Sequence, residues 1–173
     1  MQEIEVKILE VDKIRIIQKL EQLGAVKKFD GEINAFYFDF PDQRLTADNK
    51  LLRVRTKGEE YVELTFKKKI SKEKAKIMEE HEVTFKGKIA ALKEILSGIG
   101  LEELRQIQKH RISYSLGNIH FELDKMPNIP LFLEIEATSL EELKEAVEKL
   151  DFTMDDAKPW SAKDVLNHYK NYG

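Results

Sequence analysis

The sequence has no cysteine among its 173 residues. This excludes disulfide bonds, thiolate nucleophiles and zinc–thiolate sites. It also lacks any apolar run of the roughly 18–20 residues that a membrane-spanning helix needs. The net charge of -3 gives no basic excess of the kind that nucleic-acid binding requires. The first residues already have a strand pattern rather than that of a signal peptide. We therefore expect a soluble, cytoplasmic protein that binds neither nucleic acid nor membrane.

Charged residues, in contrast, are abundant and balanced in sign. They make up 35% of the chain, with 29 lysines and arginines against 32 aspartates and glutamates, whereas about a quarter is typical. The length suits one domain with a proper core. Because no internal repeat, low-complexity segment or linker interrupts the sequence, we predict a single domain over residues 1–173.

Strict alternation of charged and apolar residues is the main pattern of this sequence. At the N-terminus, Glu3, Glu5 and Lys7 alternate with Ile4 and its apolar neighbours. Since a strand points successive side chains to opposite faces, this stretch has one ionic face and one apolar face. Six later stretches repeat the pattern: Leu51–Thr56, Tyr61–Lys67, Glu79–Lys86, Ile107–Leu116, Ile119–Asp124 and Leu131–Ala137. An aromatic stretch, Ala35–Phe40, is a further predicted strand.

Helices and loops are predicted between these strands. Apolar residues at helical spacing predict four helices: from Asp12 to Gly24, from Ile89 to around Gly98 or Gly100, from a cap at Ser139, and from Ser161 to Tyr169. Gly58-Glu59 and Gly117-Asn118 are predicted turns, and a loop precedes Lys50. The basic segment Lys68–Lys76 is also predicted to be a loop, either a mobile connection or a lid that attracts an anion.

The apolar strand faces have to be covered by the apolar stripes of the helices. The charged faces would then meet inside a closed antiparallel barrel, which inverts the usual apolar interior. The acids on these faces are Glu3, Glu5, Glu80, Glu82, Glu122, Asp124, Glu134 and Glu136, and the bases are Lys7, Arg53, Arg55, Lys67, Lys109 and Arg111. A sheet whose salt-bridge ladders face water would give the same alternation, so the pattern alone leaves both arrangements open.

A ligand would explain such an ionic interior, since buried ions are costly unless they are well paired. Arginine and lysine side chains suit a polyanion, because the guanidinium fork matches phosphate oxygens. Carboxylates two residues apart on a strand lie roughly 6–7 Å apart and can share a Mg²⁺ or Mn²⁺ ion. Acids beside bases therefore favour a metal-bridged phosphate chain over a bare anion.

The ordered motifs make the chain resemble the CYTH superfamily, also called triphosphate tunnel metalloenzymes. The family's Glu-x-Glu-x-Lys signature matches residues 3–7, and its Leu-Arg-x-Arg strand matches residues 52–55. The remaining matches are Lys67, Glu80-His81-Glu82, Lys109-His110-Arg111, Asp124 and Glu134-Ile135-Glu136. The resemblance covers essentially the whole chain, in order. One departure is Phe40, where the family commonly has a threonine.

This resemblance implies an α+β fold, an eight-stranded antiparallel β-barrel that forms a charged tunnel with helices on its outer face. It implies a Mg²⁺ or Mn²⁺ cofactor held by Glu3, Glu5, Asp124, Glu134 and Glu136. The triphosphate would be bound by Lys7, Arg53, Arg55, Lys67, Lys109 and Arg111. Glu3, Glu5, Lys7 and Glu136 are the expected catalytic residues, and Glu80, Glu82 and Glu122 the expected supporting ones.

The reaction implied is that of an enzyme acting on a nucleoside or organic triphosphate. The overall resemblance is greatest to class IV adenylyl cyclases, which convert ATP to cyclic AMP and pyrophosphate. A triphosphatase acting on thiamine triphosphate, a nucleoside triphosphate or tripolyphosphate would use the same charges, as would a non-catalytic sensor of polyphosphate or nucleotide. The sequence leaves these alternatives, and a homodimer, open.

Overall fold

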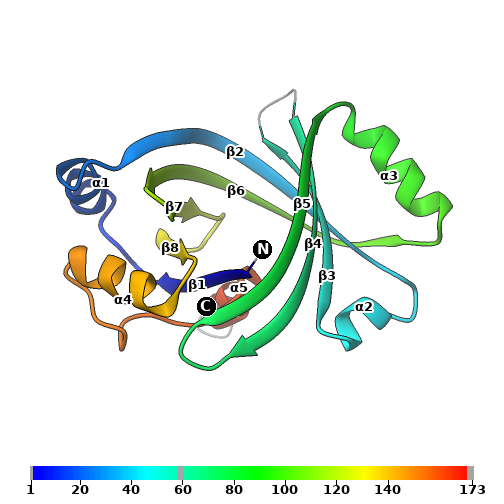
Figure 1. The fold of residues 1–173 in the computed structure, drawn as a ribbon. Helices are drawn as coiled ribbons and strands as arrows, with labels where there is room; N and C mark the ends of the chain where they lie inside the picture. Colours follow the sequence, from blue (N-terminus) through cyan, green and yellow to red (C-terminus); the bar gives the residue numbers. More distant parts are fainter. Residues whose placement is uncertain (1, 58–60, 171–173) are drawn as a thin grey trace. The chain divides into compact units, whose positions relative to one another are not determined.

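The structure is a computed structural model that describes residues 2–57 and 61–170. Within these residues there are eight strands, β1 (Gln2–Ile8), β2 (Val26–Asp39), β3 (Lys50–Lys57), β4 (Tyr61–Lys72), β5 (Lys76–Lys86), β6 (Glu102–Leu116), β7 (Ile119–Lys125) and β8 (Phe132–Ala137). They contain five helices as well, α1 (Lys13–Gln22), α2 (Arg44–Ala47), α3 (Ile89–Gly98), α4 (Leu140–Lys149) and α5 (Ala162–Lys170). The strands form one antiparallel sheet that closes in a ring, in the order β1-β5-β4-β3-β2-β6-β7-β8 (Figure 1). The predicted α+β fold with an eight-stranded antiparallel barrel is confirmed.

The chain divides into two compact units. The first, which we call the terminal unit, comprises Gln2–Asp30, Ile70–Met78 and His110–Gly173. The second, which we call the central unit, comprises Gly31–Lys69 and Glu79–Lys109. Strands β2, β4, β5 and β6 contribute residues to both units. The single domain over residues 1–173 stays a prediction, and each unit is described by itself below.

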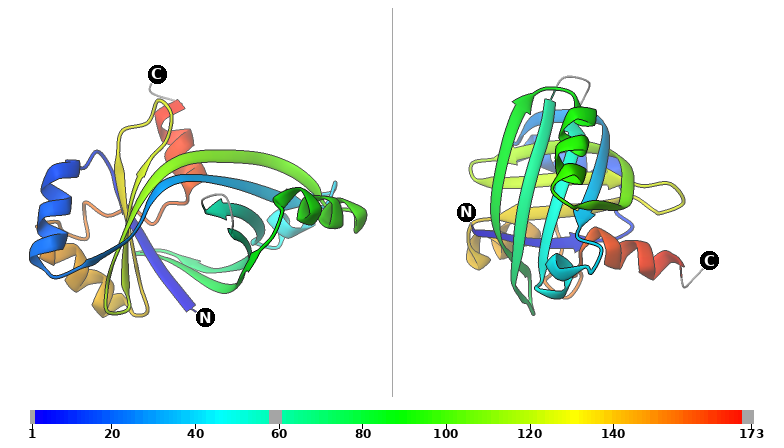
Figure 2. Two further views of the ribbon diagram at one scale, coloured as in Figure 1. Left: turned by 90° about the horizontal axis from the view of Figure 1, so that it is seen from above. Right: turned by 90° about the vertical axis from the view of Figure 1, so that its right-hand side faces the viewer.

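The core of the terminal unit lies between its strands and two helices. Val6 of β1, Phe121 of β7 and Ile135 of β8 are buried in one cluster with Leu20 of α1 and Val147 of α4. The helices α1 and α4 both lie on this apolar face of the strands (Figures 1 and 2). The expectation that helices cover the apolar strand faces is thus confirmed in this unit, and it leaves the opposite, charged face for the site.

The helix boundaries in the terminal unit follow the predicted capping residues. Asp12 caps α1, with its Oδ1 accepting a hydrogen bond from the Arg15 backbone N–H at 2.9 Å. Ser139 caps α4 in the same way, with its Oγ accepting from the Glu142 N–H at 3.2 Å. After α1, Gly24 has a φ of +80°, a conformation that favours glycine. The caps satisfy backbone donors that the first turn of a helix leaves without a partner.

The central unit has its own core, with α3 packed on strands β2, β3 and β4. Phe38, Val54 and Val62, one from each strand, are buried together with Leu96 of α3 and Leu101. The right-hand view of Figure 2 shows α3 in front of these strands. As in the terminal unit, the apolar face is covered by a helix.

The predicted loop over Lys68–Lys76 is wrong for most of its length. Strand β4 continues to Lys72 and strand β5 begins at Lys76, so only residues 73–75 form the turn between them. These strand ends could not be predicted from the local sequence, because lysines and glutamates without apolar alternation are typical of loops. Backbone pairing in the sheet prevails over that local preference. The Gly58-Glu59 turn lies outside the described residues.

Two other strands and one helix also differ from the predicted boundaries. Strand β2 begins at Val26 rather than Ala35, and β6 begins at Glu102 rather than Ile107. The predicted loop before Lys50 contains the short helix α2. Buried Asp39 organises this segment, since its carboxylate accepts hydrogen bonds from the backbone N–H groups of Leu45 and Thr46 and from the Thr46 hydroxyl. No helix among the described residues has both the length and the apolar composition needed to cross a membrane.

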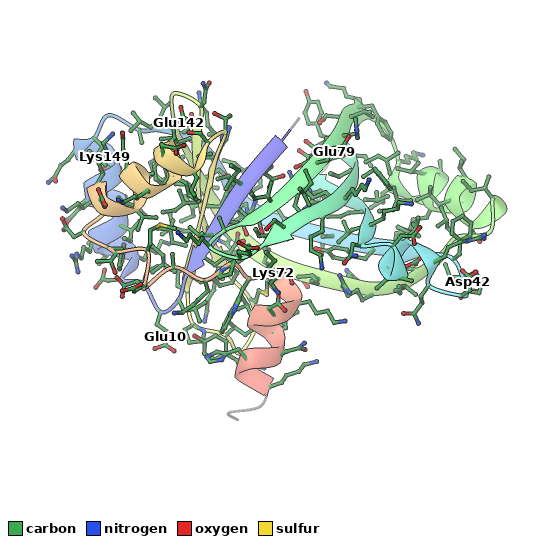
Figure 3. The ribbon with its side chains drawn as sticks, turned by 60° about the horizontal axis from the view of Figure 1, so that its bottom comes forward. Glu10, Asp42, Lys72, Glu79, Glu142 and Lys149 are labelled. Carbon is green, nitrogen blue, oxygen red and sulfur yellow. The ribbon has the colours of Figure 1, made fainter. Side chains whose placement is uncertain are left out.

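Helix α5 is joined to the end of β4 through Asp164 (Figure 3, where Lys72 is labelled beside α5). Its carboxylate accepts hydrogen bonds from Lys72 Nζ at 2.8 Å and from the Ser161 N–H and hydroxyl, both at 2.7 Å. Burial alone would raise the pKa of Asp164, but these bonds outweigh it and hold the pKa at about 2, below its ordinary value of 3.8. The Ser161 Oγ in turn accepts a hydrogen bond from the Asp164 backbone N–H at 3.2 Å, which confirms the predicted cap at Ser161.

We expect Asp164→Asn to lower the free energy of unfolding at pH 7 by about 1 kcal/mol, a figure reduced because the group is partly exposed. Because the pKa is depressed in the folded protein, this stabilisation is complete above the ordinary value of 3.8 and is lost as pH falls toward about 2. Urea unfolding at pH 7 and pH 2.5 would measure it, with Lys163→Met on the same helix as control. Equal stability of variant and wild type at pH 7 would contradict the assignment.

Candidate functional site

The charged face of the terminal unit is built by the register of four neighbouring strands. The directly opposite pairs on this face include Lys7 with Glu134, Glu5 with Glu136, Glu122 with Glu134, Ser113 with Glu122, and Arg111 with Asp124. Directly opposite side chains in an antiparallel pair lie on the same face, about 4.5–5.5 Å apart at Cβ. The structure thus brings together eight predicted site residues of this unit with their opposite signs interleaved: Glu3, Glu5, Lys7, Arg111, Glu122, Asp124, Glu134 and Glu136. Ser113, which was not predicted, lies among them.

Three of the predicted metal ligands converge at one end of this face. Glu3, Glu5 and Glu136 each offer a carboxylate oxygen, and these oxygens lie within 4.8 Å of one another. Glu5 is buried, while Glu3 and Glu136 are half-buried. Three carboxylates so close together repel one another unless a cation neutralises them. Hard oxygen donors at this spacing fit Mg²⁺ or Mn²⁺, so the residues present suit the predicted cofactor.

Lys7 is the central cation of the face and is only 1% exposed. Its Nζ donates to Glu5 Oε1 at 3.0 Å and forms an ion pair with Glu134. Burial alone would lower the pKa of Lys7, but Glu134 and Glu5 outweigh it, so the pKa is raised and the ammonium stays charged. The side chain can therefore hold the two carboxylates in place at any physiological pH.

A second lysine on this face was missed by the sequence analysis. Lys76 Nζ donates to the same oxygen, Glu5 Oε1, at 2.8 Å. The residue was missed because it was assigned to the Lys68–Lys76 loop. A signal was available, since Lys76 has the same strand parity as Glu80 and Glu82.

Arg111 and Asp124 form a second buried ion pair on this face. Arg111 Nε donates to Asp124 Oδ1 and Nη2 to Oδ2, both at 2.6 Å, and Nη2 reaches Glu134 Oε1 at 3.2 Å. Glu122 lies 3.4 Å from Arg111 Nε. Burial would lower the pKa of Arg111, but Asp124 and the other acids raise it well above its ordinary value. Both Asp124 oxygens contact Arg111, and the metal and phosphate roles of these residues stay predictions.

The charged face of the central unit is organised around two arginines. Arg55 forms an ion pair with Glu63, and Arg53 Nη2 donates to the Thr65 hydroxyl at 3.2 Å. Glu82 lies near both guanidinium groups, 3.7 Å from Arg53 and 3.8 Å from Arg55, and accepts a hydrogen bond from Thr65 at 2.9 Å. Fixed carboxylates beside guanidinium groups orient the forks. This geometry suits the supporting role predicted for Glu82.

The other predicted residues of the central unit lie on neighbouring strands. Lys67 is buried and its Nζ lies 2.8 Å from Glu80 Oε2. Lys109 is half-buried on β6. Glu63, which the site prediction omitted, shares the strand parity of Lys67, so parity alone would have placed it on this face.

Known proteins are similar to this chain over nearly its whole length. The family model described as CYTH domain matches residues 1–159. A Methanocaldococcus jannaschii protein named "Putative adenylate cyclase" is 28% identical, over 90% of this chain and 93% of that protein. A solved structure from Pyrococcus horikoshii is 26% identical and covers 94% of this chain and 98% of its own, with a TM-score of 0.77.

A further solved structure is similar in fold alone. It comes from Hippeastrum, is 16% identical, covers 96% of this chain and 95% of its own, and has a TM-score of 0.65. That protein is described as a "Putative adenylyl cyclase" with a dominant triphosphatase activity. Because the family model spans most of the sequence and agrees with the motifs and the fold, this chain belongs to the CYTH domain family.

Proposed function

We propose that the protein is a divalent-metal-dependent adenylyl cyclase of the class IV type, which converts ATP to cyclic AMP and pyrophosphate. Membership of the CYTH family supports an enzyme that acts on a small triphosphate. The observation that carries the proposal is the convergence of Glu3, Glu5 and Glu136, whose carboxylate oxygens lie within 4.8 Å of one another. The name of the Methanocaldococcus relative supports the cyclase reaction in particular.

In this proposal Glu3, Glu5 and Glu136 hold a Mg²⁺ or Mn²⁺ ion, with Asp124 and Glu134 as the further predicted ligands. When bound, such an ion neutralises phosphate charge and lowers the pKa of an attacking hydroxyl. Lys7 keeps its charge beside Glu5 and Glu134, so it is suited to hold these carboxylates and to bind a phosphate oxygen. Together with Glu3, Glu5 and Glu136, Lys7 forms the proposed catalytic set.

The cations of the proposal bind the phosphate chain. Arg53 and Arg55 present guanidinium forks that match phosphate oxygens, and Lys67, Lys109 and Arg111 add positive charge. In the cyclase reaction the ribose 3′ oxygen bonds to the α-phosphorus while the bond to the pyrophosphate oxygen breaks. Cations that bind the β- and γ-phosphates would stabilise the charge that develops on pyrophosphate as it leaves.

A triphosphatase is the second candidate, and the activity described for the Hippeastrum structure favours it. The same residues would serve, but a water molecule would attack the terminal phosphorus while its bond to the bridging oxygen breaks. The products would then be orthophosphate and the corresponding diphosphate. The two reactions differ in which phosphorus lies beside the attacking oxygen. A shift of the phosphate chain by one or two phosphates would exchange one reaction for the other.

Product analysis tests the proposal directly. We expect purified protein with Mn²⁺ and ATP to yield cyclic AMP and pyrophosphate in equal amounts, because attack at the α-phosphorus releases both together. Parallel incubations with thiamine triphosphate and tripolyphosphate serve as comparison substrates. Orthophosphate as the main product would replace the cyclase with the triphosphatase. No product from any of the three would overturn both enzymatic assignments in favour of a sensor.

A further inference from the structure

A tyrosine and an arginine that match none of the family motifs lie together in the central unit. The guanidinium carbon of Arg105, on β6, is 4.2 Å from the centre of the Tyr37 ring on β2. Tyr37 is directly opposite Arg53 in the register of β2 with β3. Directly opposite side chains lie on one face of a sheet, so Tyr37 belongs to the charged face that carries Arg53.

Strand parity gives the same placement for Arg105. Along β6, Arg105, Ile107 and Lys109 alternate with their neighbours and therefore share one face. Lys109 is one of the predicted triphosphate-binding residues. Arg105 thus precedes Lys109 on the same face of β6 and lies outside the family motif Lys109-His110-Arg111.

Arg105 differs from the other arginines of this face in its partners. Arg55 is paired with Glu63, and Arg53 contacts Thr65 and Glu82. Within residues 2–57 and 61–170, the ring of Tyr37 is the only interaction partner of the Arg105 guanidinium, and no carboxylate lies within ion-pair distance of it. Its Nε is buried and, within the same residues, has no hydrogen-bond partner.

A buried donor of this kind needs an explanation, because native proteins satisfy nearly all of their buried polar groups. Contact with an aromatic ring uses the face of the ring and none of the five N–H donors. Those donors are in a fixed fork that matches the oxygens of a phosphate group. The aromatic contact holds the guanidinium in place while its hydrogen-bonding capacity is unused.

We propose that Arg105 is a further phosphate-binding residue of the charged face, and that Tyr37 is the positioning residue that holds it. This inference rests on the proposed function, since its ligand is a phosphate group of the triphosphate substrate. A phosphate supplies to Arg105 the oxygen acceptors that the protein supplies to Arg53 and Arg55. The nucleobase is a competing ligand, because a purine ring could stack on Tyr37 in place of the guanidinium.

Binding measurements without metal test this proposal separately from catalysis. Tripolyphosphate and a non-hydrolysable ATP analogue would be titrated calorimetrically in the presence of a chelator. We expect Arg105→Gln to weaken both by about tenfold, the loss of one charge-assisted fork. Arg105→Lys should be intermediate, because it keeps the charge and loses the fork. Tyr37→Phe should bind as wild type, whereas Tyr37→Leu should weaken both ligands.

Arg44 supplies a matched control in the same unit. Its guanidinium carbon lies 3.7 Å from the Phe40 ring centre, the same kind of contact, but the residue is exposed and its Nε lies 3.4 Å from Asp42. Arg44→Gln should therefore leave both affinities unchanged. A melting curve of each variant would check that the fold is retained, and Arg105→Lys and Tyr37→Leu test the proposal even where Arg105→Gln does not fold.

Three outcomes would overturn the inference, and they differ in whether the proposed function is overturned as well. Wild-type affinity for tripolyphosphate in Arg105→Gln would remove Arg105 from the phosphate site and leave the proposed function intact. A loss confined to the ATP analogue would assign the pair to the nucleobase instead. Wild-type protein that binds neither ligand, with the chelator or with added Mn²⁺, would overturn both the inference and the proposed function.

Discussion

Replacing Asp124 with alanine is expected to lower the free energy of unfolding by about 3 kcal/mol, the lower end of the range for breaking a buried ion pair. Asp124 is fully buried and receives two N–H groups of Arg111 at 2.6 Å each. Because arginine is effectively always protonated in proteins, the Arg111 guanidinium stays charged when the carboxylate is removed. Glu134 and Glu122 remain beside it, which is why we expect the lower end.

Urea unfolding of single and double variants would measure this effect. Asp124→Leu combined with Arg111→Met removes both charges. The double variant should therefore lose less stability than the sum of the losses in Asp124→Leu alone and Arg111→Met alone. Asp30→Ala is the control, because Asp30 is an exposed carboxylate that also has a cationic partner, Lys27. Stability of Asp124→Ala within about 1 kcal/mol of wild type would contradict a buried-pair role, since exposed pairs contribute that little.

The same variant also addresses whether Asp124 holds metal. If Asp124 is a ligand, as the family resemblance implies, Mn²⁺ should raise the melting temperature of the wild type and should do so less in Asp124→Ala. If Asp124 serves only Arg111, the rise should be equal in both proteins. Each protein is compared with itself with and without Mn²⁺, so the loss of stability itself does not obscure the result.

The strand faces could be predicted from sequence because alternation is a local property. Glu3, Glu5 and Lys7 alternate with apolar residues, and the structure places them on the charged face with the apolar residues beneath helices. The lysine-rich ends of β4 and β5 lack such alternation, and only pairing with other strands reveals them. Helix α2 was missed for a related reason, since hydrogen bonds to the Asp39 carboxylate hold that segment.

Individual partners on the charged faces could not be predicted, because they depend on register between strands. Parity says that Glu5 and Lys76 share a face with other charges, but it does not say that their side chains meet. The Tyr37–Arg105 contact was missed for the same reason, and because the predicted strand began only at Ile107. Sequence therefore specified the chemistry of each face, whereas the ion pairs required the structure.

The second large effect is expected from Glu136→Gln, which should reduce turnover by about 100-fold or more, as does the loss of one group that stabilises transition-state charge. Glu136 is one of the three carboxylates that lie within 4.8 Å of one another. Glutamine keeps the shape of the side chain and removes its negative charge, so the divalent ion would lose an anionic ligand. Glu5 is a less suitable choice, because its removal would also leave Lys7 and Lys76 without that partner.

Turnover and Mn²⁺ affinity should be measured on the same preparations of Glu136→Gln. The control is Glu145→Gln, an exposed glutamate of α4 beside Lys149, which should behave as wild type in both measurements. If Glu136 acts by holding the ion, Mn²⁺ binding should weaken together with turnover, and higher Mn²⁺ should restore part of the activity. Reduced turnover with unchanged Mn²⁺ affinity would instead indicate that Glu136 acts on the substrate and does not hold the ion. Turnover equal to wild type, at limiting Mn²⁺ and with the fold intact, would remove Glu136 from the catalytic set.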